Sequence, residues 1–200
     1  MSEQLVSIPG NLAKSLPYTI YSAGYLSSIV TGNPLGAVFS TSAIIFGDVL
    51  NGVLKKSIKS VAPDVEMFKR PSPPAEGCGI YSQCNISADH KPTYGMPSGH
   101  SMIICFSAIF WILYIQKYSG MSKGWKLFST ILLLTIAILV MISRIVIGCH
   151  NFLQVIVGAM IGILLGWVVF VVLENVWPSL FVSTPVVIEC AKPKEGEVNK

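Results

Sequence analysis

The chain contains little charge. Only 12% of its 200 residues are Asp, Glu, Lys or Arg, whereas 52% are hydrophobic. A soluble domain of average composition carries about 25% charged residues. The shortage argues against a water-soluble protein and favours one that is solvated by lipid, with a length suited to about one domain.

Acidic residues are particularly few, and the chain holds ten of them. Cations such as Mg²⁺ are held by cages of carboxylate oxygens, and none of the ten acidic residues lies in the motifs described below. The sequence therefore predicts no metal and no other cofactor. The net charge of +4 comes from Lys and Arg scattered over short segments. That pattern is typical of membrane-flanking charges and predicts no nucleic-acid partner.

Uncharged runs are long enough to cross the hydrocarbon core of a bilayer, about 30 Å thick. We expect a single transmembrane domain over residues 1–180, followed by a polar tail over 181–200. Residues 18–32 are shorter and more polar, and can span, lie in the interface or re-enter. The fold class expected is an all-α, polytopic transmembrane bundle of about five to six helices. Its predicted spans are 34–54, 101–118, 127–148 and 151–173.

The polar segments fall on one membrane face. A helix ending near Lys55 and another beginning near His100 place the loop 55–100 on one side. The next two helices form a hairpin, so the turn between Arg144 and Asn151 returns to that side. We therefore expect the catalytic site at helix ends on one face of the membrane.

Two features of the long loop favour a lumenal or extracytoplasmic face, in a membrane like the endoplasmic reticulum if the protein is eukaryotic. Asn85-Ile86-Ser87 matches the glycosylation acceptor pattern, and Cys78 and Cys84 have the spacing of a small disulfide loop. Cys105 and Cys149 are interpreted as inert packing residues within or beside helices.

Three short segments contain the polar residues of interest. Each is a weak signal alone, but they occur together and in order at expected helix ends. They are Lys55-Lys56-Ser-Ile-Lys59 followed by Arg70-Pro71; Pro97-Ser98-Gly99-His100; and Ser143-Arg144, five residues, His150, three residues and Gln154.

These segments resemble the signature motifs of the phosphatidic acid phosphatase type 2 superfamily, written KxxxxxxRP, PSGH and SRxxxxxHxxxD. The resemblance extends from about Val49 to Trp167. It implies a metal-independent membrane phosphatase in which His150 is the nucleophile and forms a phosphohistidine. It also implies that His100 protonates the leaving oxygen and later activates water.

Elementary chemistry supports the same roles. A phosphoryl group in transfer carries negative charge on its oxygens, and fixed cations and N–H donors stabilise it. Lys56, Arg70 and Arg144 supply the cations, and an Arg can bind two oxygens at once. The amides and hydroxyl of Ser98, Gly99 and His100 lie where a helix begins, which suits an anion.

The sequence departs from the family pattern at two places. Six residues normally separate the Lys from Arg-Pro, but that spacing falls on Pro63, so we assign Lys56 and keep Lys55 and Lys59 as candidates. Gln154 replaces the usual Asp, whose charge stabilises the protonated histidine. A Gln carbonyl can still orient His150, and Gln here resembles the glucose-6-phosphatase and dolichyl diphosphatase branches. The short chain and Tyr94-Gly-Met-Pro favour the latter.

The expected function is that of an enzyme, a hydrolase of phosphoric monoester or anhydride bonds. Its substrate is expected to be a lipid phosphate or a polyprenyl or dolichyl diphosphate within the membrane. Two alternatives stay open: a lipid head-group phosphotransferase, and a catalytically silent lipid-binding relative. The sequence leaves the oligomeric state open.

Overall fold

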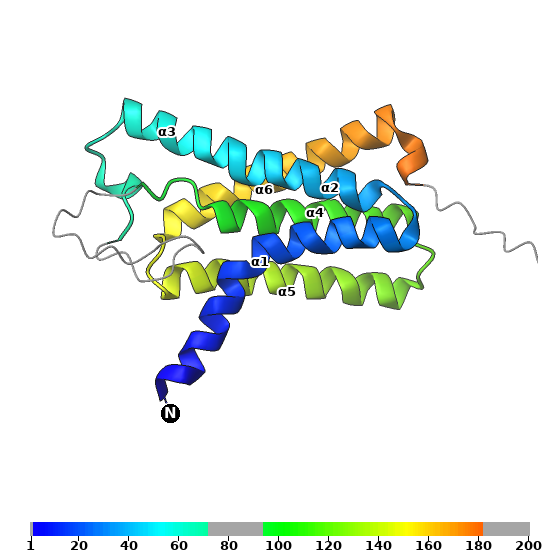
Figure 1. The fold of residues 1–200 in the computed structure, drawn as a ribbon, viewed down its shortest axis with the longest axis horizontal. Helices are drawn as coiled ribbons and strands as arrows, with labels where there is room; N and C mark the ends of the chain where they lie inside the picture. The colour runs from blue at the N-terminus through cyan, green and yellow to red at the C-terminus, as the bar shows by residue number, and fades with distance from the viewer. Residues whose placement is uncertain (1, 72–93, 182–200) are drawn as a thin grey trace, which may run out of the picture.

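The computed structural model describes residues 2–71 and 94–181, with side chains from residue 15 onward. These residues form an elongated helical bundle (Figure 1). Its α-helices are α1 (Ser2–Thr31), α2 (Leu35–Ile44), α3 (Asn51–Val61), α4 (Gly99–Tyr118), α5 (Lys123–Val146) and α6 (Phe152–Val176). A π-helical segment, η1 (Ile45–Leu50), joins α2 to α3, and two short 3-10 turns are η2 (Glu66–Phe68) and η3 (Pro178–Leu180).

The predicted fold class is confirmed, because the helices include four that are long and apolar enough to cross a membrane. The first of them is the continuous rod Leu35–Val61, built from α2, η1 and α3, and the others are α4, α5 and α6. The rod ends at Val61 and not at the expected residue 54. The placement of the segment 18–32 was left open; its residues up to Thr31 belong to α1 and run beside α2.

Helix α4 lies at the centre of the bundle and packs closely against α6. Gly158, Gly162 and Gly166 of α6 face the α4 backbone, and a Cβ at Gly162 would overlap the carbonyl oxygen of Met102. Small residues at such spacing let transmembrane helices approach within van der Waals contact of their backbones. This contact fixes the start of α4 relative to the start of α6.

Aromatic packing and hydroxyl contacts fix the other helices around α4. Phe39 of α2 lies 5.9 Å from Phe106 and 5.0 Å from Phe110, measured between ring centroids. Helix α1 is held to α2 by the Ser40 hydroxyl, which donates to the carbonyl of Tyr21 at 2.9 Å. Such contacts matter in lipid, where apolar burial alone gives little drive for helix association.

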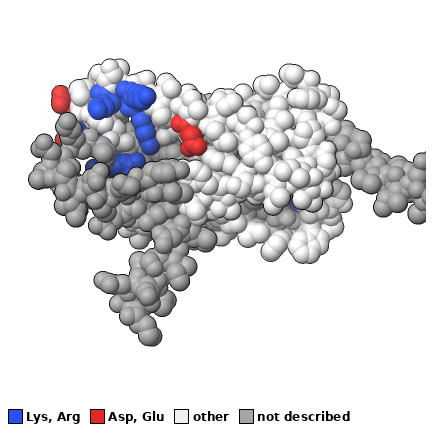
Figure 2. Space-filling model, in the orientation of Figure 1, with Lys and Arg blue, Asp and Glu red and all other residues white. Residues whose placement is uncertain are grey.

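The two ends of the bundle differ in chemistry. In the face shown in Figure 2, Lys and Arg gather at one end, while most of the remaining described surface is uncharged. At that end α3 and α5 finish and α4 and α6 begin (Figure 1).

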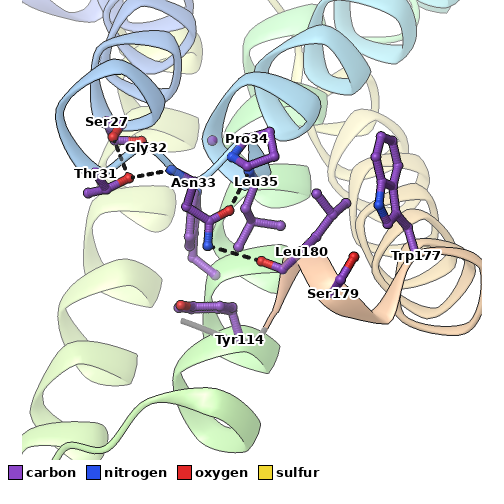
Figure 3. A pocket seen from close by; sticks show the side chains of 12 residues that line it. Ser27, Thr31, Gly32, Asn33, Pro34, Leu35, Tyr114, Trp177, Ser179 and Leu180 are labelled. Carbon is purple, nitrogen blue, oxygen red and sulfur yellow. Dashed lines mark hydrogen bonds between the residues drawn. The ribbon is translucent and has the colours of Figure 1, made fainter. Parts of the chain in front are cut away.

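The opposite end contains a cavity of about 520 Å³ between the α1–α2 turn, α4 and η3. There Asn33 accepts a hydrogen bond from the Leu35 amide at 2.9 Å and donates one to the Leu180 carbonyl at 3.2 Å (Figure 3). None of the predicted site residues lines it.

Candidate active site

The second motif forms the N-terminal cap of α4. The Ser98 hydroxyl accepts a hydrogen bond from the Ser101 amide at 3.4 Å and contacts the Ser101 hydroxyl at 3.0 Å. The Ser98 amide, in contrast, donates to the Gln154 carbonyl at 3.0 Å. The expectation that this amide faces an anion is therefore wrong. The contact instead ties the second motif to the third.

The third motif is a tight turn between α5 and α6. Gly148 adopts a φ of 77°, a left-handed conformation that glycine accepts without steric cost. The turn folds His150 back so that its amide donates to the Arg144 carbonyl at 3.2 Å. The Asn151 side chain then caps α6 by accepting from the Gln154 amide at 2.9 Å. His150 thus stands immediately before a helix N-terminus.

Gln154 fixes the orientation of the His150 ring. Its Nε2 donates to the carbonyls of Met67 at 3.0 Å and Lys69 at 2.8 Å. Carbonyls only accept, so the amide oxygen must face His150, whose Nδ1 lies 3.0 Å away. Nδ1 must then carry the proton, which leaves a lone pair on Nε2. The arrangement selects the tautomer that a nucleophile requires.

Two arginines bring buried positive charge to this end. The Arg144 side chain is fully buried, and neither of its terminal nitrogens has a hydrogen-bond partner among the described residues. The buried Nε of Arg70 likewise lacks one within that part of the chain. Leaving a buried charged donor unpaired costs more than about 1–3 kcal/mol. An anion such as a phosphate would satisfy both guanidinium groups.

Burial and nearby positive charge keep His150 neutral. Burial first, and then the charges of Arg70 and Lys55, lower the pKa of the His150 imidazole from 6.5 to about 3. Burial also lowers the pKa of Arg70. A neutral imidazole has the lone pair needed to attack phosphorus at physiological pH.

The structure distinguishes the three candidate lysines of the first motif. Lys55 is partly buried, and its charge reaches His150, whereas Lys56 is exposed and makes no such contribution. Lys59 is exposed and lies over the Tyr94 ring, 5.9 Å from its centroid. These positions do not favour the assignment of Lys56, because neighbouring residues of a helix point about 100° apart. We move the assignment to Lys55.

Arg70 reaches the site because the chain turns back after α3. Lys69 forms an isolated antiparallel bridge with Tyr94, and the Gly95 amide donates to the Phe68 carbonyl at 2.9 Å. A Cβ at Gly95 would overlap the Gln154 side chain. The η2 segment therefore brings Arg70 beside the third motif, despite the displaced spacing in the sequence.

Sequence reasoning missed a role for Asn51. Its buried side chain donates to the Pro97 carbonyl at 3.2 Å, and its Oδ1 lies close to Gly99. Asn51 stands four residues before Lys55, so the two share one helix face. That four-residue spacing was the sequence feature that could have pointed to Asn51. Asn51 holds the second motif against the helix that carries the first.

Cys149 corrects another expectation. It is fully buried and disulfide-bonded, so its interpretation as an inert packing residue is wrong. Cys105 is free, and the partner of Cys149 therefore lies outside the described residues. The predicted pairing of Cys78 with Cys84 and the acceptor Asn85 also fall outside them.

The described residues, 2–71 and 94–181, contain no group of three or more His, Cys, Asp and Glu side chains that could hold a metal. The site instead combines two histidines and fixed cations. Its His100 lies close enough to His150 to influence the pKa of His150. Fold and site together define an integral membrane protein with a buried, cationic, two-histidine site.

Comparison with known proteins identifies the family. The sequence pattern of the PAP2 superfamily matches residues 36–178, and the chain belongs to this superfamily. Among solved structures, the PAP2-type phosphatidylglycerolphosphate phosphatase from Bacillus subtilis superposes with a TM-score of 0.62 at 23% identity. That match covers 86% of this chain and 77% of the other, and at this identity it shows the fold.

Two curated relatives are similar in sequence. "Lipid phosphate phosphatase gamma" from Arabidopsis thaliana is 25% identical over 173 residues, covering 82% of this chain and 67% of that protein. "Dolichyldiphosphatase 1" from Dictyostelium discoideum is 32% identical over 148 residues, covering 72% of this chain. The match spans 55% of the Dictyostelium protein.

The double role of Gln154 predicts the effect of Gln154→Glu. A carboxylate can accept from His150, but its second oxygen would face the carbonyls of Met67 and Lys69 and repel them. We expect kcat to fall and KM to rise, with kcat/KM lower by about tenfold or more, because Arg70 follows this segment. Steady-state phosphate release measures both constants.

Gln116→Glu, at the opposite end of the bundle, is the matched control. Activity equal to or above wild type would show that the added charge outweighs the lost carbonyl contacts.

The electrostatics of His150 predict different effects for two adjacent lysines. The pH profile of kcat/KM reports ionisations of the free protein. On the acid side, kcat/KM should fall where His150 becomes protonated, and the pKa of His150 is depressed. Lys55→Gln removes one cause of that depression, so the pKa of His150 rises and the acid limb moves to higher pH. Lys56→Gln should leave the limb where wild type has it. The pH profile of each variant with one phosphomonoester measures this, since substrate ionisation is then common to all. A shift in Lys56→Gln alone would restore Lys56 to the first motif.

Proposed function

We propose that the protein hydrolyses a lipid phosphate or, preferably, a polyprenyl diphosphate through a phosphohistidine on His150, without a metal ion. The observation that carries this proposal is a neutral, oriented His150 whose backbone contacts Arg144, a buried arginine with no hydrogen-bond partner for its two terminal nitrogens among the described residues. A buried cation beside a nucleophile with a free lone pair suits an electrophile that is itself anionic.

In the first step, the Nε2 lone pair of His150 attacks the phosphorus and the bond from phosphorus to the leaving oxygen breaks. His100 gives its proton to that oxygen, so the leaving group departs as an alcohol or a lipid phosphate. Arg144, Arg70 and Lys55 stabilise the charge on the equatorial oxygens. The Ser98 hydroxyl and the Gly99 amide at the start of α4 add donors.

In the second step, water attacks the phosphorus of the phosphohistidine. His100, now neutral, takes a proton from the water, and the bond between phosphorus and Nε2 breaks. Inorganic phosphate leaves and both histidines return to their starting states. Throughout, Gln154 accepts the Nδ1 hydrogen bond of His150, which keeps Nε2 directed at the phosphorus.

The substrate class rests on the relatives and the membrane setting. The Arabidopsis relative is named a lipid phosphate phosphatase and the Dictyostelium relative a dolichyldiphosphatase. The latter has the higher identity over its aligned residues. The site lies at the ends of membrane-spanning helices, where a lipid head group can enter while its apolar part stays in the bilayer.

We further propose that the catalytic end faces an oxidising compartment, such as the lumen of the endoplasmic reticulum. The support is Cys149, which is disulfide-bonded and directly precedes His150. Disulfides persist in extracytoplasmic compartments and are rare where thiols are kept reduced.

The covalent mechanism predicts a burst with His100→Ala. Nitrophenolate needs no protonation, so this variant should still phosphorylate His150 from p-nitrophenyl phosphate but lack the base for hydrolysis. We expect about one nitrophenolate per protein, then almost none. Stopped-flow absorbance with excess EDTA measures the nitrophenolate burst.

His150→Ala should give no burst. A burst in His150→Ala, or loss of the wild-type phosphatase activity when EDTA is added, would contradict the mechanism. Transfer of phosphate to an added alcohol in preference to water would favour the phosphotransferase.

The orientation can be tested by adding one cysteine at either end of the bundle and comparing its labelling with that of the wild type. Ser57→Cys is exposed on α3 at the catalytic end, and Ser122→Cys is exposed before α5 at the other. In sealed microsomes, an impermeant maleimide should label Ser122→Cys directly and Ser57→Cys only after permeabilisation. The reverse pattern would place the catalytic end in the cytoplasm.

A further inference from the structure

A largely apolar cavity of about 400 Å³ lies between α1, α4 and α5. Among its lining residues are Ile104, Ala108 and Trp111 of α4, and Ile20 and Ala23 of α1. Its volume lies within the range of about 300–1,000 Å³ typical of small-molecule sites. The cavity lies within the membrane-spanning part of the bundle, away from the charged end.

One face of α4 packs against α6, the helix that follows the proposed nucleophile His150. Ser98, Met102 and Phe106 lie against Gly158, Gly162 and Gly166 of α6. His150 precedes α6 by two residues. The nucleophile therefore approaches the site from this side of α4.

The other face of α4 begins with His100 and continues into the cavity. His100 follows Ser98 by two residues, which places it about 200° around the helix. Ile104, Ala108 and Trp111 follow His100 by four, eight and eleven residues, so the four side chains form one stripe. The proposed acid for the leaving group thus stands at the head of the surface that lines the cavity.

Phosphoryl transfer places the attacking and leaving atoms roughly in line on opposite sides of the phosphorus. With His150 on the α6 side, the leaving oxygen lies on the His100 side, and the chain bonded to it extends along the cavity stripe. From His100, the cavity residues of α4 begin about 6 Å and end about 16 Å along the helix axis. This depth suits the apolar chain of a lipid whose head group occupies the site.

We propose that this cavity binds the apolar chain of the leaving group and that its occupant is a single polyprenyl chain. The inference rests on the proposed phosphatase function and specifies its substrate. This cavity of about 400 Å³ follows the His100 stripe along one face of α4, so it matches a one-chain lipid better than a glycerolipid with two acyl chains. Trp111 lies at the deep end of the stripe and limits how far the chain can extend along α4.

Ala23→Phe tests the proposal by filling the cavity from α1. Ala23 is exposed and lines the cavity, whereas its exposed neighbour Ser22 does not, so Ser22→Phe is the matched control. Farnesyl diphosphate has the chain, and p-nitrophenyl phosphate lacks one. We expect Ala23→Phe to lower kcat/KM for farnesyl diphosphate by about tenfold or more. Its activity on p-nitrophenyl phosphate, and both activities of Ser22→Phe, should stay within about twofold of wild type.

Other outcomes separate this inference from the function on which it rests. Unchanged farnesyl diphosphate hydrolysis in Ala23→Phe, or equal losses on both substrates, would overturn the chain site while leaving the phosphatase intact. A loss confined to phosphatidic acid would assign the cavity to an acyl chain and also overturn it. Hydrolysis that persists in His150→Ala would overturn the proposed function instead. Thermal unfolding of both Phe variants checks that they are equally folded.

Discussion

The close contact between α4 and α6 is the constraint on which the site depends. The second motif begins α4 and the third begins α6, so their relative placement is set by how near these helices approach. At Gly158, Gly162 and Gly166 no side chain of α6 separates the two backbones. The hydrogen bond from the Ser98 amide to the Gln154 carbonyl is possible only at this separation. Packing of α4 against α6 inside the membrane thereby determines how the second and third motifs are placed at the membrane surface.

Gln154 shows how a neutral amide can replace the usual carboxylate. An Asp beside His150 would favour the protonated imidazole, and its oxygens could not donate to the carbonyls of Met67 and Lys69. The amide does donate to them, so one side chain both orients His150 and anchors the segment before Arg70. The protein gives up charge stabilisation of the imidazolium and gains a rigid connection between two motifs. Arg70 and Lys55 act in the same direction, because their charges also favour the neutral form of His150.

The sequence predicted the helical bundle and the shared membrane face because uncharged runs determine spans, and spans determine sidedness. It did not resolve the first motif. The prediction ended the helix near Lys55, whereas α3 continues to Val61, and in a helix Lys55 and Lys56 face different directions. The return of Arg70 through η2 depends on contacts with Tyr94 and Gly95, which sequence spacing does not encode. Likewise the disulfide of Cys149 could not be inferred, since pairing depends on spatial proximity.

Under the proposed function, the arrangement divides recognition of an amphiphilic substrate between two regions. Cations and donors at the helix ends recognise a phosphoryl group but contain no information about what is attached to it. Discrimination between lipids must therefore come from the path of the leaving group. Helix α4 joins the regions, because one of its faces packs against α6, which follows His150, and the opposite face begins at His100 and leads to the apolar cavity. On this proposal, a change in the residues lining that face would alter the lipid that the protein accepts without altering the chemistry at the helix ends.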